Sequence, residues 1–303
     1  MKKFLLLMLF IALLISSCKK SSNNDGSTPN PEIKNYRIAK IMFDPASSDS
    51  VVFDYINNHL SIISHYHYFD GHQVRDKFLY YYNPDNTVSM VIKQYYGSFR
   101  GDTTFYIFQN NLLSKINYRY SYDDMSGPAN YKTKINADIT ISNALITQLL
   151  CSYNYHHTWY YPPTVYQDSI QYTSTASFSY NGNNIIKQSL INQFGHDGSV
   201  IYEYDSKINP IKLSGAMPTL YSFSSTHNLS YDSTDCVSLT SPPIDNYLND
   251  FCCLCSNNIT KETHSNYTIS YQYEYNSIGL PTKALISNKK GASIILFIYE
   301  QIN

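Results

Sequence analysis

The sequence predicts an all-β protein, one long antiparallel up-and-down meander of hairpins that either stays an open, twisted sheet or closes into a barrel-like shape. Two observations support this fold class. A phrase of alternating aromatics, turn residues and an apolar alternating run returns along the chain. Tyrosine is also unusually frequent, with 31 Tyr against 14 Phe and 1 Trp. A tyrosine side chain has an apolar ring and a hydroxyl that hydrogen-bonds to water. The preference for tyrosine therefore indicates sheets with much of their surface exposed to solvent.

The repeated phrase predicts β-hairpins. Its long forms begin at Tyr81 (YYNPDNTVSMVI), Phe178 (FSYNGNNIIKQS), Tyr202 (YEYDSKINPIKL) and Tyr273 (YEYNSIGLPTKA), and its short forms begin at Phe53 (FDYINNHLSII) and Tyr106 (YIFQNNLLSKI). Aromatics at alternate positions place their rings on one face of a strand, and the Asn, Asp and Gly that follow reverse the chain. The next run then pairs antiparallel with the first. We therefore expect one hairpin per phrase.

Two further hairpin turns are expected at Asp70–Gly71 and Asp197–Gly198, because Asp-Gly is a strong short-range turn signal. Joined together, the hairpins make a meander from Tyr36 to Ile302. A single hairpin cannot bury its apolar face, whereas stacked neighbours can, and this is a physical reason for the repetition.

The N-terminus has the features of a targeting segment. Lys2 and Lys3 precede an apolar segment from Phe4 to Ile15, which is too short to span a bilayer as a mature helix. The tetrapeptide Ile-Ser-Ser-Cys that ends at Cys18 resembles the lipobox of bacterial lipoproteins. The resemblance implies a lipoprotein signal peptide over residues 1–17 and lipidation of Cys18. A plain secretory peptide and a lone transmembrane anchor are the alternatives.

A polar linker follows the cysteine. Residues 21–31 contain no apolar side chain and are rich in Ser, Asn and Pro, so they cannot bury enough surface to offset the entropy of ordering them. We expect a lipidated cysteine and disordered tether over residues 18–32 and a single β-meander domain over residues 33–303. Lysine rather than aspartate follows Cys18, and the lipoprotein resemblance then favours the outer membrane, on either its periplasmic face or the cell surface.

One segment carries a closer resemblance. The stretch LCSNNITKETHSNYTISYQYEYNSIGLPTKALIS, residues 254–287, resembles the closing section of a Bacteroidetes lipoprotein family of unknown function. The shorter phrases are similar to the YD-type hairpin repeats of secreted bacterial proteins. This resemblance implies a porin-like, YD-repeat-related β fold, and since its motifs are structural it implies no catalytic residue.

The segment SPPIDNYLNDFCCLCS, residues 241–256, interrupts the β pattern. Apolar residues recur there at helical spacing and form one stripe. Ser241 can cap the N-terminus, and Pro242 stands where its missing N–H costs nothing. The pattern predicts a helix near 242–255 laid against the sheet.

Five cysteines remain besides Cys18, namely Cys151, Cys236, Cys252, Cys253 and Cys255. An exported protein lies in a compartment that permits disulfides, so we expect Cys236 to bridge to one cysteine of the helix cluster. The odd count leaves at least one thiol unpaired. Metal binding by the cluster is the alternative, but the Cys-Cys-x-Cys spacing lacks the usual Cys-x₂-Cys pair.

Histidines and aromatics give two weaker signals. His65 and His67 share one strand face with His72 beyond a turn; solvent-facing histidines are favoured over a metal site, and no cofactor is expected. Aromatic residues cluster before a Pro-Pro turn. They indicate a surface on which sugar rings stack, and the alternative is ordinary packing between neighbouring strands. These candidate ligand-binding aromatics are Trp159, Tyr160 and Tyr161.

Four Asp-Ser or Asp-Thr triplets resemble the O-glycosylation signal of exported Bacteroidetes proteins. The residues that this resemblance marks are Ser50, Thr103, Ser169 and Ser233.

The composition excludes some classes of function. The formal net charge is -1 and no basic stripe is apparent, so nucleic acid is not an expected partner. Nucleophile-elbow, zincin, Walker and dinucleotide motifs are missing from the sequence. We expect a non-enzymatic envelope lipoprotein that holds the membrane through its lipid anchor and binds or scaffolds a glycan or an envelope protein.

Two other functions stay open. The first is an envelope glycan-binding or glycan-hydrolysing protein whose paired carboxylates converge only in space. The second is an integral barrel, against which stand the lipobox and the charges on both faces of Val74–Tyr82.

Overall fold

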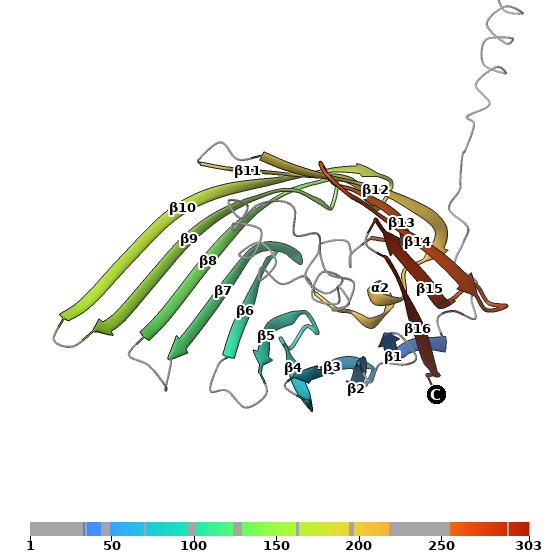
Figure 1. Cartoon of the computed structure of the whole chain (residues 1–303). Coiled ribbons are helices and arrows are strands. Elements are labelled where there is room, and N and C mark those ends of the chain that lie inside the picture. Colours follow the sequence, from blue (N-terminus) through green and yellow to red (C-terminus); the bar gives the residue numbers. More distant parts are fainter. Residues whose placement is uncertain are drawn as a thin grey trace, which may run out of the picture.

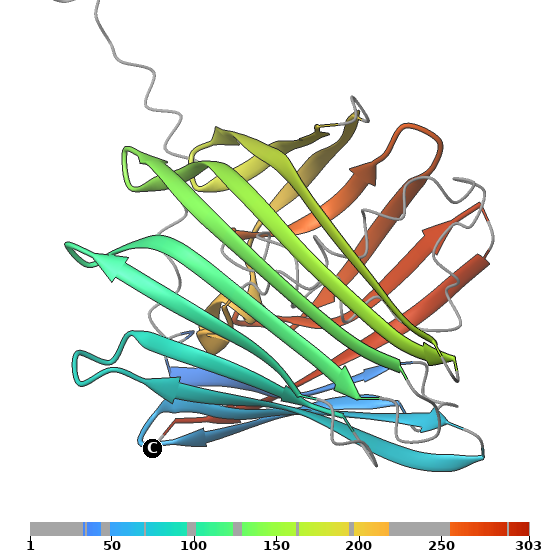
Figure 2. The ribbon, with the colours of Figure 1, turned by 90° about the vertical axis from the view of Figure 1, so that its left-hand side faces the viewer.

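The computed structural model describes residues 33, 35–43, 49–69, 71–95, 101–123, 129–161, 164–193, 197–217, 255–289 and 291–302. Within these ranges sixteen antiparallel strands form one closed barrel (Figures 1 and 2). Each strand pairs with the strands that precede and follow it in sequence, and β1 pairs with β16 to complete the ring. The predicted all-β meander is therefore confirmed, and the sheet is closed rather than open.

The strands in chain order are β1 (Tyr36–Phe43), β2 (Ser50–Ile56), β3 (His59–Phe69), β4 (His72–Tyr82), β5 (Val88–Gln94), β6 (Gly101–Gln109), β7 (Leu112–Asp123), β8 (Ala129–Ser142), β9 (Leu145–Tyr161), β10 (Thr164–Asn181), β11 (Asn184–Asn192), β12 (Asp197–Ile208), β13 (Asn257–Thr263), β14 (Thr268–Tyr275), β15 (Pro281–Asn288) and β16 (Gly291–Gln301). The helix α2 (Pro210–Ser214) follows β12.

One end of the barrel is built from tight turns, and we call it the turn end. It carries the turns at 57–58, 110–111, 143–144 and 182–183. Both residues of the first three turns have positive φ; those of Asn110 and Asn111, for example, are 53° and 61°. Asparagine tolerates this left-handed backbone, and the resulting twist matches that of the flanking strands. Because Tyr36 pairs with Gln301, the chain also enters and leaves the barrel at the turn end.

The repeated phrase has a common three-dimensional form. Near the turn end, the pairing register shifts by a residue within each of the hairpins β2–β3, β4–β5, β6–β7, β8–β9, β10–β11 and β14–β15. In six strands a tyrosine close to this position donates its hydroxyl to a carbonyl of the strand before. The bonds are Tyr55 to Ile38 (2.9 Å), Tyr82 to Leu60 (2.7 Å), Tyr180 to Ile146 (2.7 Å), Tyr204 to Ile185 (2.7 Å), Tyr273 to Ile259 (3.0 Å) and Tyr299 to Pro281 (2.8 Å). The repeated phrase thus combines a turn with a hydrogen bond from a tyrosine hydroxyl to the preceding strand.

The interior of the barrel is mainly apolar. Buried side chains from every part of the ring form one cluster, among them Ile63, Ile116 and Leu149, each fully buried. Figure 1 shows α2 within the ring of strands, and its Ile211 belongs to the same cluster. Since side chains alternate along a strand, the positions between these buried residues face outward.

Charged residues occupy many of those outward positions. Four ion pairs join adjacent strands on the outer surface, namely Arg37–Glu300 (2.5 Å), Lys115–Asp138 (2.8 Å), Lys261–Glu203 (2.8 Å) and Lys283–Glu274 (2.6 Å). In each pair the two residues are direct cross-strand partners. The interior is therefore mainly apolar, with the cross-strand partners Lys93 and Asp102 buried in it, and the outer surface combines these ion pairs with exposed apolar residues such as Ile201 and Ile298.

Two of the predicted turns are wrong. The phrase at Tyr202 forms no hairpin, because Asn209 caps a helix by accepting the Ile211 N–H at 3.0 Å, and Pro210 occupies the first turn of α2. At the second site, Asp197 and Gly198 begin β12 and pair with β11 instead of forming the turn. The hairpin predicted near Asp70–Gly71 is confirmed, since β3 ends at Phe69, β4 begins at His72, and Gly71 between them has a φ of 75°.

Several predicted segments lie outside the described residues. They are the signal peptide (1–17), the tether with Cys18 (18–32, where Ile33 begins the described part) and the helix near 242–255, of which Cys255 alone is described. In the described ranges no helix has the length and apolar character needed to cross a membrane.

Candidate functional site

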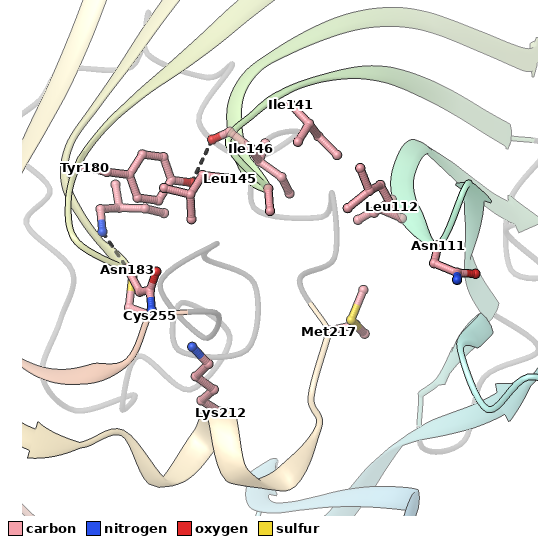
Figure 3. Close-up of a pocket in the computed structure, with 13 residues that line it drawn as sticks. Asn111, Leu112, Ile141, Leu145, Ile146, Tyr180, Asn183, Lys212, Met217 and Cys255 are labelled. Atoms are coloured by element: carbon pink, nitrogen blue, oxygen red, sulfur yellow. Dashed lines mark hydrogen bonds between the residues drawn. The ribbon is translucent and has the colours of Figure 1, made fainter. Parts of the chain in front are cut away.

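A cavity of about 390 Å³ lies at the turn end of the barrel (Figure 3). Its wall is largely aliphatic, with Leu113 from β7, Ile146 from β9, Ile185 from β11 and Met217 after α2. Its volume lies within the usual range of small-molecule sites.

The polar groups in this wall contact other protein groups. The Tyr180 hydroxyl donates to the Ile146 carbonyl, and the Cys255 thiol accepts the Ile185 N–H at 3.3 Å. Lys212 Nζ donates to Ser256 Oγ at 3.0 Å. The cavity therefore offers apolar contact with one ammonium group at its edge.

A second buried cluster surrounds Cys151 of β9, which pairs with Ala137 of β8 and Ser174 of β10. Cys151 is a free, fully buried thiol, as the odd cysteine count requires for at least one residue. Burial raises its pKa to about 11, so it remains protonated and is a poor nucleophile. Beside it, the Tyr153 and Tyr172 rings stack with centroids 4.4 Å apart, and Ser174 Oγ donates to the Tyr153 hydroxyl at 3.2 Å. These contacts are those of a packing core.

Carboxylates that lie near the interior are engaged by tyrosines. Tyr95 donates to Asp102 Oδ2 at 2.6 Å, Tyr271 donates to Glu262 Oε1 at 2.5 Å, and Tyr275 donates to Asp205 Oδ2. His264 Nε2 is a further neighbour of Glu262, 3.3 Å from its Oε2. Each carboxylate thus acts as an acceptor within the barrel wall.

Of the three histidines predicted to face solvent, His65 and His67 lie on the inward face of their strand and His72 is exposed. His65 and His67 are half-buried, with ring centroids 4.8 Å apart, because their strand positions face the barrel interior beside the fully buried Ile63. His72 is exposed at the start of β4. Among the residues that the structure describes, no group of three or more His, Cys, Asp or Glu side chains could hold a metal ion.

The predicted sugar-stacking aromatics end β9. The backbone of Trp159 pairs with Tyr166 of β10, and Tyr160 and Tyr161 follow it to the end of the strand. Every residue of β10 from Thr164 to Gln171 is exposed, so this part of the β9–β10 hairpin extends beyond the packed interior, as Figure 1 shows. Sugar stacking at this hairpin stays a prediction.

The other predicted sites fall in different surroundings. Of the glycosylation candidates, Ser169 is exposed, Thr103 is half-buried, Ser50 is buried, and Ser233 lies outside the described residues. Cys236, Cys252 and Cys253 also lie outside them, so the disulfide from Cys236 stays a prediction.

Sequence analysis missed a cationic groove on the outer surface. Its lining includes Arg119 of β7, Lys132 and Lys134 of β8, and His156 of β9, which we call the basic patch. The groove has a volume of about 390 Å³. These residues are dispersed along the sequence and meet only through strand register, which local patterns do not reveal.

Fold and surface together define a closed antiparallel barrel with a mainly apolar interior and ion pairs on its exterior. No family model matches the sequence, and no curated protein matches it. The solved structures to which the chain is similar include a porin-like protein from Bacteroides uniformis. That chain is 11% identical, with a TM-score of 0.45, and the match covers 87% of this chain and 96% of that chain.

Proposed function

We propose that this chain is a non-enzymatic lipoprotein of the bacterial cell envelope, whose barrel stands outside the lipid and acts through binding at its surface. The observation that carries the proposal is the set of outward ion pairs. A transmembrane barrel has an apolar outer band and a polar interior, whereas this barrel has a mainly apolar interior and ion pairs on its outer surface.

The energetics favour an aqueous exterior. A lysine or arginine on the lipid face of a barrel costs about 2–4 kcal/mol at the bilayer midplane. Three of the four ion pairs lie on the arc from β12 to β1 and the fourth lies on β7/β8, so charges occur on two separate parts of the ring. A barrel in water carries the same pairs at almost no cost, because exposed ion pairs are worth about 0–1 kcal/mol.

In this proposal the lipid anchor on Cys18 orients the barrel relative to the membrane. About 18 residues separate Cys18 from Tyr36, and a flexible chain of that length spans roughly 20–25 Å. Because β1 begins at the turn end, the cavity at that end faces the membrane and the exposed β9–β10 hairpin points away from it.

Binding without catalysis agrees with the interior chemistry. The Cys151 thiol has a raised pKa, and the carboxylates of Asp102, Asp205 and Glu262 accept hydrogen bonds from tyrosines. Glycan binding is the form of surface recognition that the exposed hairpin favours, since Val165 and Tyr166 are 53% and 48% exposed there.

Detergent phase partition of the full-length protein and of a variant that lacks residues 2–18 tests this proposal. We expect the lipidated protein to enter the detergent phase of Triton X-114. The variant should enter the aqueous phase with an unchanged far-UV circular dichroism spectrum. If the folded variant still partitions with detergent, the barrel itself is embedded in lipid and the proposal is wrong.

A further inference from the structure

We infer that the basic patch on the outer face of β7–β9 binds an anionic saccharide, with carboxylate groups on the sugar as the charged partners. The inference rests on the proposed function, because it requires this face to be in water. Figure 2 looks onto these strands from outside the barrel.

The pairing register of β7, β8 and β9 places the residues of the basic patch next to one another. Arg119 is directly opposite Lys134, and Lys132 is directly opposite His156. Adjacent strands lie about 4.8 Å apart, and residues two apart on one strand lie about 6.6 Å apart on the same face. Three permanent cations therefore lie within roughly 10 Å of one another.

The charge arrangement differs from that on the rest of the outer surface. Lys115 lies four residues before Arg119 on the same face of β7, and its cross-strand partner is Asp138. Arg119 has another cation, Lys134, in the equivalent place. Like charges directly opposite each other destabilise a sheet, so a bound anion would relieve a repulsion that the folded chain carries without it.

Uncharged residues predominate around the patch. The outward residues Thr103, Phe105, Asn117, Asn136, Ser152, Asn154 and Thr158 flank it, and one acidic position, Asp123 of β7, lies two residues beyond Ser121, which pairs with Lys132. The three cations give the patch a positive local charge in a protein whose formal net charge is -1. The patch complements an anion.

Arg119 supplies the specific contact. Its guanidinium carbon lies 5.3 Å from the centre of the Phe105 ring, which holds the planar group against the sheet. A guanidinium presents a fork of N–H donors that matches a carboxylate in bidentate geometry, whereas the lysines act as point charges.

The flanking side chains favour a sugar over a simple ion. Thr103, Arg119, Lys134, Asn154 and Gln171 form one register row across β6–β10. That row spans about 19 Å, with hydroxyl and amide groups at its two ends and the cations between them. Hydroxyl and amide groups pair with sugar hydroxyls, and a row of this length accommodates a chain of several sugars.

The test uses the variant that lacks residues 2–18 and three probes: polygalacturonate, neutral dextran and inorganic phosphate. The test variant is Arg119→Gln with Lys134→Gln. The matched control is Lys187→Gln with Lys77→Gln, which removes the same charge elsewhere on the outer surface. Binding is measured by microscale thermophoresis at 50 mM and 300 mM NaCl, and the melting temperature of each variant is recorded.

We expect polygalacturonate to bind, dextran not to bind, and added salt to weaken binding. The test variant should lose at least about tenfold in affinity, while the control variant keeps its affinity within about twofold. The melting temperature of the test variant should be unchanged or higher, because its repulsion is gone.

Equal losses in the two variants, or binding of polygalacturonate without loss in the test variant, would place the site elsewhere. No binding to polygalacturonate at 50 mM NaCl would refute the inference, and full competition by millimolar phosphate would make the patch a simple anion site. Each of these results leaves the phase-partition result untouched, so failure of the patch is distinguishable from failure of the proposed function.

Discussion

The Tyr180 hydroxyl donates a hydrogen bond of 2.7 Å to the carbonyl oxygen of Ile146, across the barrel wall from β10 to β9. Tyr180 is the second aromatic of the phrase at Phe178, and its acceptor Ile146 pairs with Ile141 at the point where the register of β8 against β9 shifts. A register shift interrupts the regular ladder, and buried carbonyls need a donor. The repeated tyrosine therefore has a specific role, which phenylalanine cannot fill.

Replacing Tyr180 with phenylalanine tests this role. The Tyr180→Phe variant keeps the ring but removes the donor, so we expect a loss of about 1–2 kcal/mol in the free energy of unfolding. Tyr81→Phe is the control, because Tyr81 is 43% exposed, and it should change stability by less than about 0.5 kcal/mol. Urea unfolding followed by tyrosine fluorescence measures both. Equal effects of the two substitutions would contradict the role.

Buried tyrosines also predict instability at alkaline pH. Burial raises the pKa of Tyr172 to about 12, and burial likewise raises the pKa of Tyr55, Tyr82, Tyr153 and Tyr299. In the unfolded chain these groups titrate near pH 10. Above pH 10 the unfolded chain loses protons that the barrel retains, so stability is full below pH 10 and falls as the pH rises towards 12.

The measurement is the melting temperature from pH 8 to pH 12, with tyrosinate absorbance at 295 nm recorded in parallel. Exposed tyrosines should ionise reversibly near pH 10, and the buried set should ionise only with unfolding. In the Tyr172→Phe variant the melting temperature should fall less steeply above pH 10. A melting temperature that stays constant to pH 12 would show that burial does not hold these hydroxyls neutral.

Local chemistry explains which parts of the fold the sequence predicts. The hairpins at Phe53, Tyr106, Phe178 and Tyr273 are predicted correctly, because alternation and turn residues act within a dozen positions. The phrase at Tyr202 fails because Asn209 and Pro210 form a helix start that resembles a turn. Barrel closure depends on pairing of Tyr36 with Gln301, and that non-local contact leaves no local pattern.

The same distinction applies to the candidate sites. Arg119 and Lys134 are neighbours because of the register of β7 against β8, and the sequence contains no run of basic residues that marks the basic patch. Pairing the residues of β7 and β8 in antiparallel register, starting from the segment that connects them, places these two basic residues opposite each other. The inward direction of His65 and His67 depends likewise on which strand face the closed barrel buries.

Gly182 tests the left-handed geometry of the turns. Its φ is +57°, and a Cβ added there would meet no atom within 4 Å, so backbone strain is the single cost of a side chain. We expect Gly182→Ala to destabilise the barrel by about 1 kcal/mol. Gly198→Ala is the matched control, since that glycine also has open space but lies in β12 without a positive φ. Thermal unfolding of both variants makes the comparison, and a Gly182→Ala variant as stable as the control would argue against a left-handed turn.

The Lys115–Asp138 pair tests which side of the wall meets water. These side chains lie 2.8 Å apart on the outer surface, beside the buried Ile116 and Ala137. Replacing both with leucine removes an exposed ion pair worth about 0–1 kcal/mol and creates an apolar patch. In water we expect little change in the melting temperature and concentration-dependent self-association, which sedimentation velocity detects. An aqueous double variant that stays monomeric at high concentration, and gains stability in detergent micelles, would instead indicate that this face contacts lipid.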